Sequence, residues 1–346
     1  MGIKDLFKLL QSHAPTAVQP SSTQNFVNQK VAIDASVLLY QFLTTIVTRD
    51  GQPLTNSKNE PTSHIIGIIS RCTRLAEAGV KPIFVFDGAA GDAKSGELLK
   101  RKEAKKRNSE KAEKAKEEGN VSEALKYAKR AVRVTPEIGA QAIKLLELMG
   151  IPCVRADGEA EILCVQMAKS GLCSAVASSD LDVVAHQCPL FVKNIGTDKE
   201  VVQIEFAKVL SELNMEPEKF VDLCILMGCD YTDTIPGVGV KTAFNLMQKY
   251  NSIDEILESG FGEKIEDLEG YLKSVAIARE IFFSTNELKI DLGLKFSAPK
   301  EKELVAFLVD EMQFDVNNAK QKITKYINSK KSIKQTTLSG FIKKIK

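Results

Sequence analysis

The sequence lacks the residues on which several kinds of metal site depend. It has only three histidines, and none of its seven cysteines forms a CxxC pair. A zinc knuckle or a His-rich metal centre is therefore excluded, and any bound metal ion would have oxygen ligands. The odd number and scattered positions of the cysteines indicate reduced thiols in an intracellular protein.

Long apolar runs are also missing. No stretch offers the roughly 20 apolar residues that a membrane-spanning helix needs. The N-terminus has neither the apolar segment of a secretory signal nor the Ser or Thr at position 6 that myristoylation favours. We therefore expect no association with a membrane. The composition, 44% hydrophobic and 27% charged over 346 residues, instead indicates a globular protein with one large core or two ordinary ones.

The net charge of +2 conceals an uneven distribution of charge. Residues 94–134 carry a net charge of +7 and residues 320–346 carry +9, which leaves −14 on the rest of the chain. Two separate basic regions beside an acidic body predict a partner with a charged backbone, and nucleic acid is the natural example.

Several short apolar segments end in an acidic residue and alternate with helical patterns. Residues 31–34, 83–87 and 175–180 are such segments, and residues 65–78 and 138–149 have helical periodicity. Strand and helix in alternation predict an α/β fold, with a mostly parallel central sheet flanked by helices. Ligands of such sheets bind beyond the carboxyl ends of the strands, where these acids lie.

Three further segments differ from this pattern. Residues 93–134 are rich in Lys and Glu and poor in large apolar residues, which predicts helices that project from the core. The pattern after about residue 205 is helical and contains a glycine-rich turn at residues 236–241. Residues 331–346 are basic and polar, and we interpret them as a flexible tail.

Seven carboxylates follow strands or begin helices in this reading: Asp34, Asp87, Glu159, Glu161, Asp180, Asp182 and Asp230. Each alone has an ordinary interpretation as a turn residue or helix cap. If the strand order brings them to one edge, however, their mutual repulsion requires cations. Oxygen ligands suit Mg²⁺, for which Mn²⁺ can substitute. Two such ions about 4 Å apart would activate a water for hydrolysis of a phosphodiester.

A carboxylate cluster repels DNA, so the protein must also supply cations near the scissile phosphate. Lys94 and Arg101 are seven residues apart, which places them on one face of a helix, a short loop after Asp87. An ordinary solvated helix is the alternative explanation for this pair.

Taken in order, the motifs resemble those of the flap endonucleases of eukaryotic type, which belong to the structure-specific 5′ nuclease superfamily. The resemblance covers nearly the whole chain. It rests on residues 1–3, 31–36, 85–88, 94–98, 159–161, 179–182, 228–231 and 237–241. Residues 89–91, 157–158 and 229 depart from the usual family pattern, without removing a carboxylate or a catalytic cation.

The resemblance implies roles for the acids and for the two cations. Around one Mg²⁺ it places Asp34, Asp87, Glu159 and Glu161, and around the other Asp180, Asp182 and Asp230. Lys94 and Arg101 lie at the base of a helical arch, residues 92–135, which lets a single strand pass and excludes duplex DNA.

The resemblance also implies DNA contacts outside this cluster. Residues 220–250 form a helix-hairpin-helix of the helix-two-turn-helix type, which can hold a K⁺ ion against the duplex. Tyr40 supports the unpaired nucleotides, although a core position explains it equally well, and Arg71 and Arg74 contact the backbone or a 3′ flap, although simple exposure is the alternative. The expected DNA-contacting residues are Tyr40, Arg71, Arg74, Glu159, Gly228, Asp230, Gly237, Gly239 and Lys241.

The end of the chain resembles the box by which replication proteins bind the sliding clamp PCNA. Gln335, Leu338, Phe341 and Ile342 form this box, and one 3₁₀ turn places Leu338 and Phe341 on one side. We expect a monomer that docks on the trimeric clamp, acting in Okazaki fragment maturation and long-patch base excision repair. The expected location is the nucleus, with mitochondria as a second site.

The expected organisation is a nuclease core over residues 1–330 and a clamp-binding tail over 331–346. Within the core we expect an N-terminal nuclease region (1–107), an internal nuclease region (123–255) and a C-terminal helical part (256–330).

Two other classes of function compete with the 5′ flap endonuclease with 5′–3′ exonuclease activity. A sibling 5′ exonuclease or repair incision nuclease would have no clamp box or a far longer insertion between Asp87 and Glu159. A non-catalytic clamp-bound scaffold would lack at least one metal ligand. A magnesium phosphatase explains neither the glycine-rich turn nor the tail.

Overall fold

The computed structural model describes residues 2–88, 95–285, 288 and 292–342, with the side chains of 95–102, 104–105 and 332–342 left out. Lys94 therefore lies outside the described residues, and of Arg101 and the clamp box only the backbone is described. Within the described residues, no helix has the length and apolar character needed to cross a membrane.

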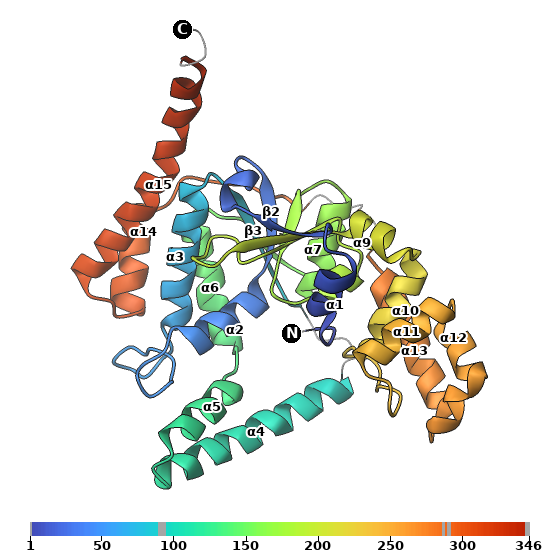
Figure 1. The fold of residues 1–346 in the computed structure, drawn as a ribbon. Helices are drawn as coiled ribbons and strands as arrows, with labels where there is room; N and C mark the ends of the chain where they lie inside the picture. The colour runs from blue at the N-terminus through green and yellow to red at the C-terminus, as the bar shows by residue number, and fades with distance from the viewer. Residues whose placement is uncertain (1, 89–94, 286–287, 289–291, 343–346) are drawn as a thin grey trace.

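A seven-stranded sheet lies at the centre of the molecule, in the order β1-β7-β6-β5-β2-β3-β4 (Figure 1). The strands from β6 to β4 in this order run parallel, and β7 and β1 add an antiparallel edge. The predicted mostly parallel sheet is confirmed. The strands are β1 (Val18–Ser21), β2 (Lys30–Asp34), β3 (Lys81–Phe86), β4 (Cys153–Arg155), β5 (Ala175–Ala177), β6 (Leu190–Lys193) and β7 (Val201–Glu205).

Side chains that alternate along the strands divide the interior into two cores. In β2, Ala32 joins one core, whereas Val31 and Ile33 join the other, because successive strand residues face opposite sides of a sheet. Both faces are thus covered by apolar helix surfaces, which is why the parallel strands are almost continuously apolar.

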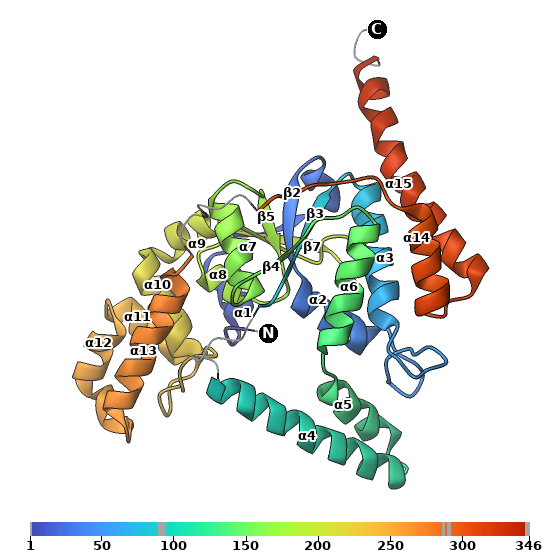
Figure 2. The same ribbon diagram turned by 180° about the vertical axis from the view of Figure 1, so that it is seen from behind.

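The helices that pack in the first core lie on the same side of the molecule as α7, with α10 to α13 grouped at one end, and those of the second core lie on the side of α3 (Figures 1 and 2). The first group is α1 (Leu6–His13), α7 (Ala160–Lys169), α8 (Asp182–Ala185), α9 (Phe206–Leu213), α10 (Pro217–Met227), α11 (Val240–Lys249), α12 (Ile253–Ile256) and α13 (Leu268–Phe283). The second group is α2 (Ala35–Thr45), α3 (Ser63–Glu77), α6 (Pro136–Leu148), α14 (Glu301–Ala306) and α15 (Val316–Ile342).

The predicted C-terminal helical part, residues 256–330, is divided between these two faces. Helix α13 packs against α10, whereas α14 and α15 pack against α6 and α3. The Asp222 carboxylate stabilises the first of these contacts, because it accepts two hydrogen bonds of 2.7 Å from the Arg279 guanidinium.

The Lys- and Glu-rich segment forms two helices, α4 (Ser95–Glu117) and α5 (Val121–Ala131), which lie against each other below the sheet (Figure 1). Gly119 reverses the chain between them with a φ of +72°, a conformation that favours glycine. The prediction that this segment projects from the core is confirmed. Among the described side chains, Leu125 of α5 approaches Gly51 in the loop between α2 and α3.

Helix α15 extends beyond the point at which the sequence predicts a tail. It continues to Ile342, reaching away from the body of the molecule (Figure 1). Ala319, Ile323 and Tyr326 anchor its first half in the second core. An anchored helix propagates readily through following residues that contain no proline. Leu338 and Phe341 therefore lie on adjacent turns of an α-helix, where residues three apart also share a face.

The buried His64 makes stability depend on pH. It is fully buried at the start of α3, and this burial lowers its pKa from 6.5 to about 4. The unfolded chain takes up a proton first, so the free energy of unfolding falls as the pH drops from 6.5 towards 4, by up to about 3 kcal/mol from this group. His64→Gln should remove this contribution. Urea titrations at pH 7.5 and 4.5 measure it, and equal pH dependence in both proteins would contradict it.

Candidate active site and metal centre

Asp34 is the most constrained of the predicted site residues. It ends β2 and caps α2, because its Oδ1 accepts a hydrogen bond of 3.1 Å from the Val37 backbone N–H. Its Oδ2 accepts one of 3.3 Å from the Ser178 hydroxyl, which follows the neighbouring strand β5. Burial, together with the charges of Asp87 and Asp180, raises its pKa to about 7. The sheet thus holds a carboxylate where its charge is unfavourable.

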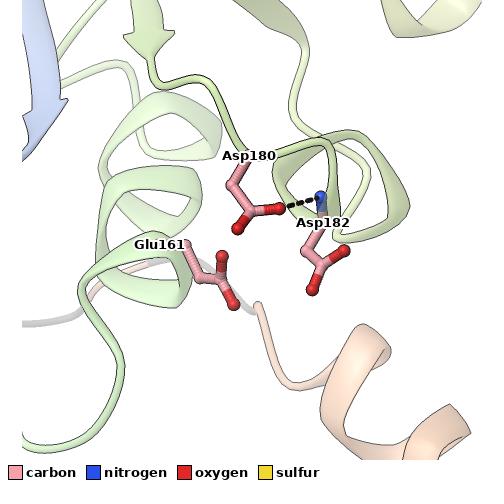
Figure 3. A group of neighbouring side chains, drawn as sticks. All are labelled: Glu161, Asp180 and Asp182. Atoms are coloured by element: carbon pink, nitrogen blue, oxygen red, sulfur yellow. Dashed lines mark hydrogen bonds between the residues drawn. The ribbon is translucent and has the colours of Figure 1, made fainter. Parts of the chain in front are cut away.

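Three further carboxylates converge on one another (Figure 3), and one of them, Asp180, interacts electrostatically with Asp34. Ligand oxygens of Glu161, Asp180 and Asp182 all lie within 4.8 Å of one another, and all three side chains are buried. Glu161 comes from the first turn of α7, Asp180 from the loop after β5, and Asp182 is the first residue of α8. The Asp182 backbone N–H donates a hydrogen bond of 3.2 Å to Asp180 Oδ1, which fixes the two carboxylates relative to each other.

Asp87, which follows β3, and Glu159 both lie at the start of α7, and the charge of Asp87 acts on Asp34. Asp87 Oδ1 accepts a hydrogen bond of 2.9 Å from the Ala160 backbone N–H. Glu159 is the residue before the helix, and the Tyr231 hydroxyl lies 3.4 Å from its carboxylate. Negative charge at a helix N-terminus is favourable, which offsets part of the repulsion within the cluster.

Asp230 lies in the loop after α10, next to Tyr231. Since Tyr231 reaches Glu159, this loop adjoins the start of α7. The predicted division of the acids between two ions is not resolved by these positions. Glu161, expected with the first ion, lies close to Asp180 and Asp182, which are expected with the second, and the assignment of ligands to two ions stays a prediction.

The donor set fits hard divalent cations. All the converging groups are carboxylates, and burial of several like charges is strongly unfavourable without a cation. The raised pKa of Asp34 expresses this cost directly. An acidic cluster that can bind a metal ion is therefore present at the carboxyl ends of the central strands.

A pocket of about 330 Å³ adjoins this cluster, with Asp34 in its wall. Arg71 and Lys199 contribute positive charge to the same wall. Arg71 donates a hydrogen bond of 3.1 Å to the Ile195 carbonyl and lies over the Phe42 ring, and burial lowers its pKa to about 10. It is therefore half-buried at the pocket, not the freely solvated side chain of the alternative explanation.

The other predicted DNA contacts outside the acids fall in different environments. Arg74 forms an ion pair of 2.6 Å with Asp198. Tyr40 is half-buried on α2 and does not belong to the buried core, which leaves its ring partly accessible. Whether any of these side chains contacts DNA stays a prediction.

The glycine-rich turn connects α10 to α11 and presents its backbone to solvent. Ile235 and Val238 are buried, and the Val238 N–H donates to the Ile235 carbonyl across a tight turn. Gly237, with a φ of +78°, and Gly239 are exposed, and a side chain on either would meet no atom within 4 Å. Lys241 is exposed in the first turn of α11.

Comparisons with known proteins agree with this geometry. The chain matches the XPG N-terminal domain over residues 1–108 and the XPG I-region over residues 150–230. Flap endonuclease 1 of Schizosaccharomyces japonicus is 39% identical over 99% of this chain and 92% of its own length. This chain belongs to the flap endonuclease 1 family.

Solved structures show the same fold. The flap endonuclease-1 structure from Methanococcus jannaschii has 32% identity and a TM-score of 0.69, covering 91% of this chain and 96% of its own. The catalytic core of Rad2, solved in complex with a DNA substrate, has a TM-score of 0.68 at 19% identity, covering 94% of this chain and 100% of its own.

Sequence reasoning missed several side chains that support the acids of this flap endonuclease. Ser178 bonds Asp34, and Tyr231 reaches Glu159. His186 is fully buried with its Nε2 4.0 Å from Glu161, and its ring packs 5.0 Å from that of Phe282. Tyr231 and Ser178 lie within two positions of predicted acids in the sequence, so a role in supporting those acids could have been predicted. His186 and Phe282 gave none, because their contact depends on how α13 packs.

The repulsion within the cluster should make a ligand substitution stabilising in the absence of metal. Asp34→Asn keeps acceptors and donors for Val37 and Ser178 and removes the buried charge. An acid whose folded pKa is raised destabilises the fold above its unfolded pKa of 3.8, most fully above about 7. We expect Asp34→Asn to raise the free energy of unfolding at pH 8 in EDTA by up to about 4 kcal/mol. A variant less stable than the wild type in urea titration would contradict this.

Proposed function

We propose that this chain binds Mg²⁺ at the carboxylate cluster and hydrolyses DNA at 5′ flap junctions. The observation that carries the proposal is the convergence of buried acids at the carboxyl ends of β2 and β5 and in the first turn of α7, in a chain of this family. Two ions are proposed, with Mn²⁺ as a substitute. Their ligands would be Asp34, Asp87, Glu159, Glu161, Asp180, Asp182 and Asp230.

Bound divalent ions would supply the charge that attracts a scissile phosphodiester and lowers the pKa of an attacking water. Hydrogen bonds from neighbouring residues hold several of these carboxylates in place. Val37 and Ser178 fix Asp34, Ala160 fixes Asp87, and Tyr231 fixes Glu159. Such second contacts orient metal ligands before any ion arrives.

We propose that cationic side chains on the arch draw the scissile phosphate towards the acids. Lys94 and Arg101 would place positive charge against the phosphate as negative charge develops on it. Arg71 and Lys199, in the pocket beside Asp34, supply further positive charge next to the acids. A single strand passing between the body of the protein and the arch formed by α4 and α5 would reach the cluster, whereas the arch would exclude a duplex.

The turn between α10 and α11 is proposed to bind duplex DNA without reading its sequence. Exposed backbone N–H groups around Gly237 and Gly239, with Lys241 at the helix start, are suited to a phosphate. A K⁺ ion at this helix-two-turn-helix remains part of the proposal. Selection would then depend on junction shape.

The decisive experiment compares three labelled DNAs of equal strand length in Mg²⁺: a double flap, a nicked duplex and a single strand. We expect cleavage at the flap junction to predominate, with slower 5′–3′ exonuclease activity at the nick. Preference for the single strand would favour a general 5′ exonuclease instead. No cleavage of any DNA, with the flap still bound, would favour a scaffold.

Asp180→Ala should abolish flap cleavage while flap binding stays within a few-fold of the wild type. The substitution removes a proposed metal ligand and also lessens the repulsion of DNA. Asp157→Ala is the matched control, because Asp157 is an exposed acid two residues before Glu159 and is not a proposed ligand. Single-turnover cleavage and fluorescence anisotropy measure the two quantities. Turnover of Asp180→Ala above about a tenth of the wild-type rate at saturating Mg²⁺ would refute its role.

We further propose that the end of α15 binds the sliding clamp PCNA through Gln335, Leu338, Phe341 and Ile342. A monomer docked on this trimeric ring would act during replication and repair. We propose the nucleus as its location, with mitochondria as a second one. The box lies away from the acidic cluster, at the far end of α15 (Figure 1). Clamp binding and catalysis should therefore be separable.

Phe341→Ala should leave cleavage of free flap DNA unchanged and remove its stimulation by the clamp. A buried aromatic anchor contributes roughly 2 kcal/mol or more at an interface, so clamp affinity should fall about thirtyfold or further. Calorimetric titration of the clamp with the full-length chain and with Phe341→Ala tests this. Lys344→Ala is a control for loss of basic charge alone, and equal affinities for all three proteins would leave the box without a role.

A further inference from the structure

The backbone of Gly2 lies against two carboxylates of the cluster. A β-carbon at this position would lie 2.0 Å from Asp180 Oδ1 and 2.3 Å from Asp182 Oδ1, well inside any permitted contact. The φ of Gly2 is +78°, which also disfavours an L side chain. Two independent constraints therefore require glycine here, and one of them is contact with the proposed metal ligands.

The next residue fixes one of these carboxylates directly. The Ile3 backbone N–H donates a buried hydrogen bond of 2.8 Å to Asp182 Oδ1. Asp182 is separated from Ile3 by 179 positions in the sequence, so this bond joins the start of the chain to the segment after β5. An amide bound to a carboxylate restricts its rotation and favours its charged form.

The N-terminal segment is held rigidly enough to act on Asp182. The Ile3 side chain is 2% exposed and Leu6 is fully buried, both within the first core. Helix α1, which follows, also packs against α9. The Ile3 amide thus belongs to a segment that apolar packing holds in place.

We propose that Gly2 and the Ile3 amide are positioning residues of the metal centre. This segment sets the orientation of the Asp180 and Asp182 carboxylates, a role that rests on the metal binding proposed above. The Ile3 amide binds the Asp182 carboxylate. The Asp182 amide in turn binds the Asp180 carboxylate (Figure 3). Because Gly2 has no β-carbon, the two carboxylates can occupy the space next to its backbone. A side chain at residue 2 displaces both of them.

Gly2→Ala tests this with Gly171→Ala as its control. Gly171 also has a positive φ, +69°, but a β-carbon there would meet no atom within 4 Å. Both variants therefore place an alanine at an unfavourable positive φ. Only in Gly2→Ala would the new β-carbon overlap the carboxylates. Metal binding is read without turnover, from the rise of the melting temperature as MgCl₂ is added to protein first freed of metal with EDTA.

We expect Gly2→Ala to need about tenfold or more Mg²⁺ for half of its thermal shift, as is usual when a group supporting a metal ligand is lost. Gly171→Ala should bind Mg²⁺ like the wild type, and flap cleavage by Gly2→Ala should recover in part at high Mg²⁺. Equal half-saturating concentrations for the two variants would overturn the inference. A wild-type chain that neither binds Mg²⁺ nor cleaves flaps would overturn the proposed function, and this inference with it.

A second measurement uses the unaltered backbone, in case Gly2→Ala does not fold. The Ile3 amide can be observed by NMR in a chain labelled with ¹⁵N-isoleucine, and assigned from its loss in Ile3→Val. Its resonance should move on addition of Mg²⁺ with the same midpoint as the thermal shift. An Ile3 amide chemical shift that does not change while Mg²⁺ binds would show that the Ile3–Asp182 hydrogen bond is independent of the metal centre, which would contradict the proposal.

Discussion

Repulsion between buried carboxylates is the constraint on which this structure depends. The parallel order of β5, β2 and β3 brings the ends of three strands together, and each is followed by an acid of the cluster. The repulsion between these carboxylates destabilises the folded state, and packing in the rest of the fold must offset it. Two apolar cores on opposite faces of the sheet hold it, and the raised pKa of Asp34 shows the strain that they sustain.

Elements distant in sequence share the task of orienting these acids. Ile3 binds Asp182, Ser178 binds Asp34, and Tyr231 reaches Glu159. The N-terminal segment, the central strands and the loop before α11 therefore all end at one place. The centre is therefore formed by segments spread from residue 3 to residue 231 and not by a single motif.

Much of this could be predicted from the sequence. Apolar segments that end in acids indicate parallel strands, and parallel strands place those acids at one edge, so the pattern itself indicated Asp34, Asp87 and Asp180. The predicted roles of Glu159, Glu161, Asp182 and Asp230 rested on the resemblance to the family. The contact of Glu161 with Asp180 and Asp182 was not, because it depends on where α7 lies on the sheet. Neither the bond between Ile3 and Asp182 nor the burial of His186 has a local signal. The helical end of α15 was missed because a basic, polar composition also suits a tail, and composition does not report an anchored helix.

The central claim is that the clustered acids bind divalent cations. Anomalous diffraction from crystals of the chain soaked in Mn²⁺ tests it most directly, since the signal locates the metal without assuming a function. The account predicts strong anomalous density within bonding distance of the Glu161, Asp180 and Asp182 carboxylates. Density confined to other surfaces, with these three side chains unchanged and without metal, would contradict it.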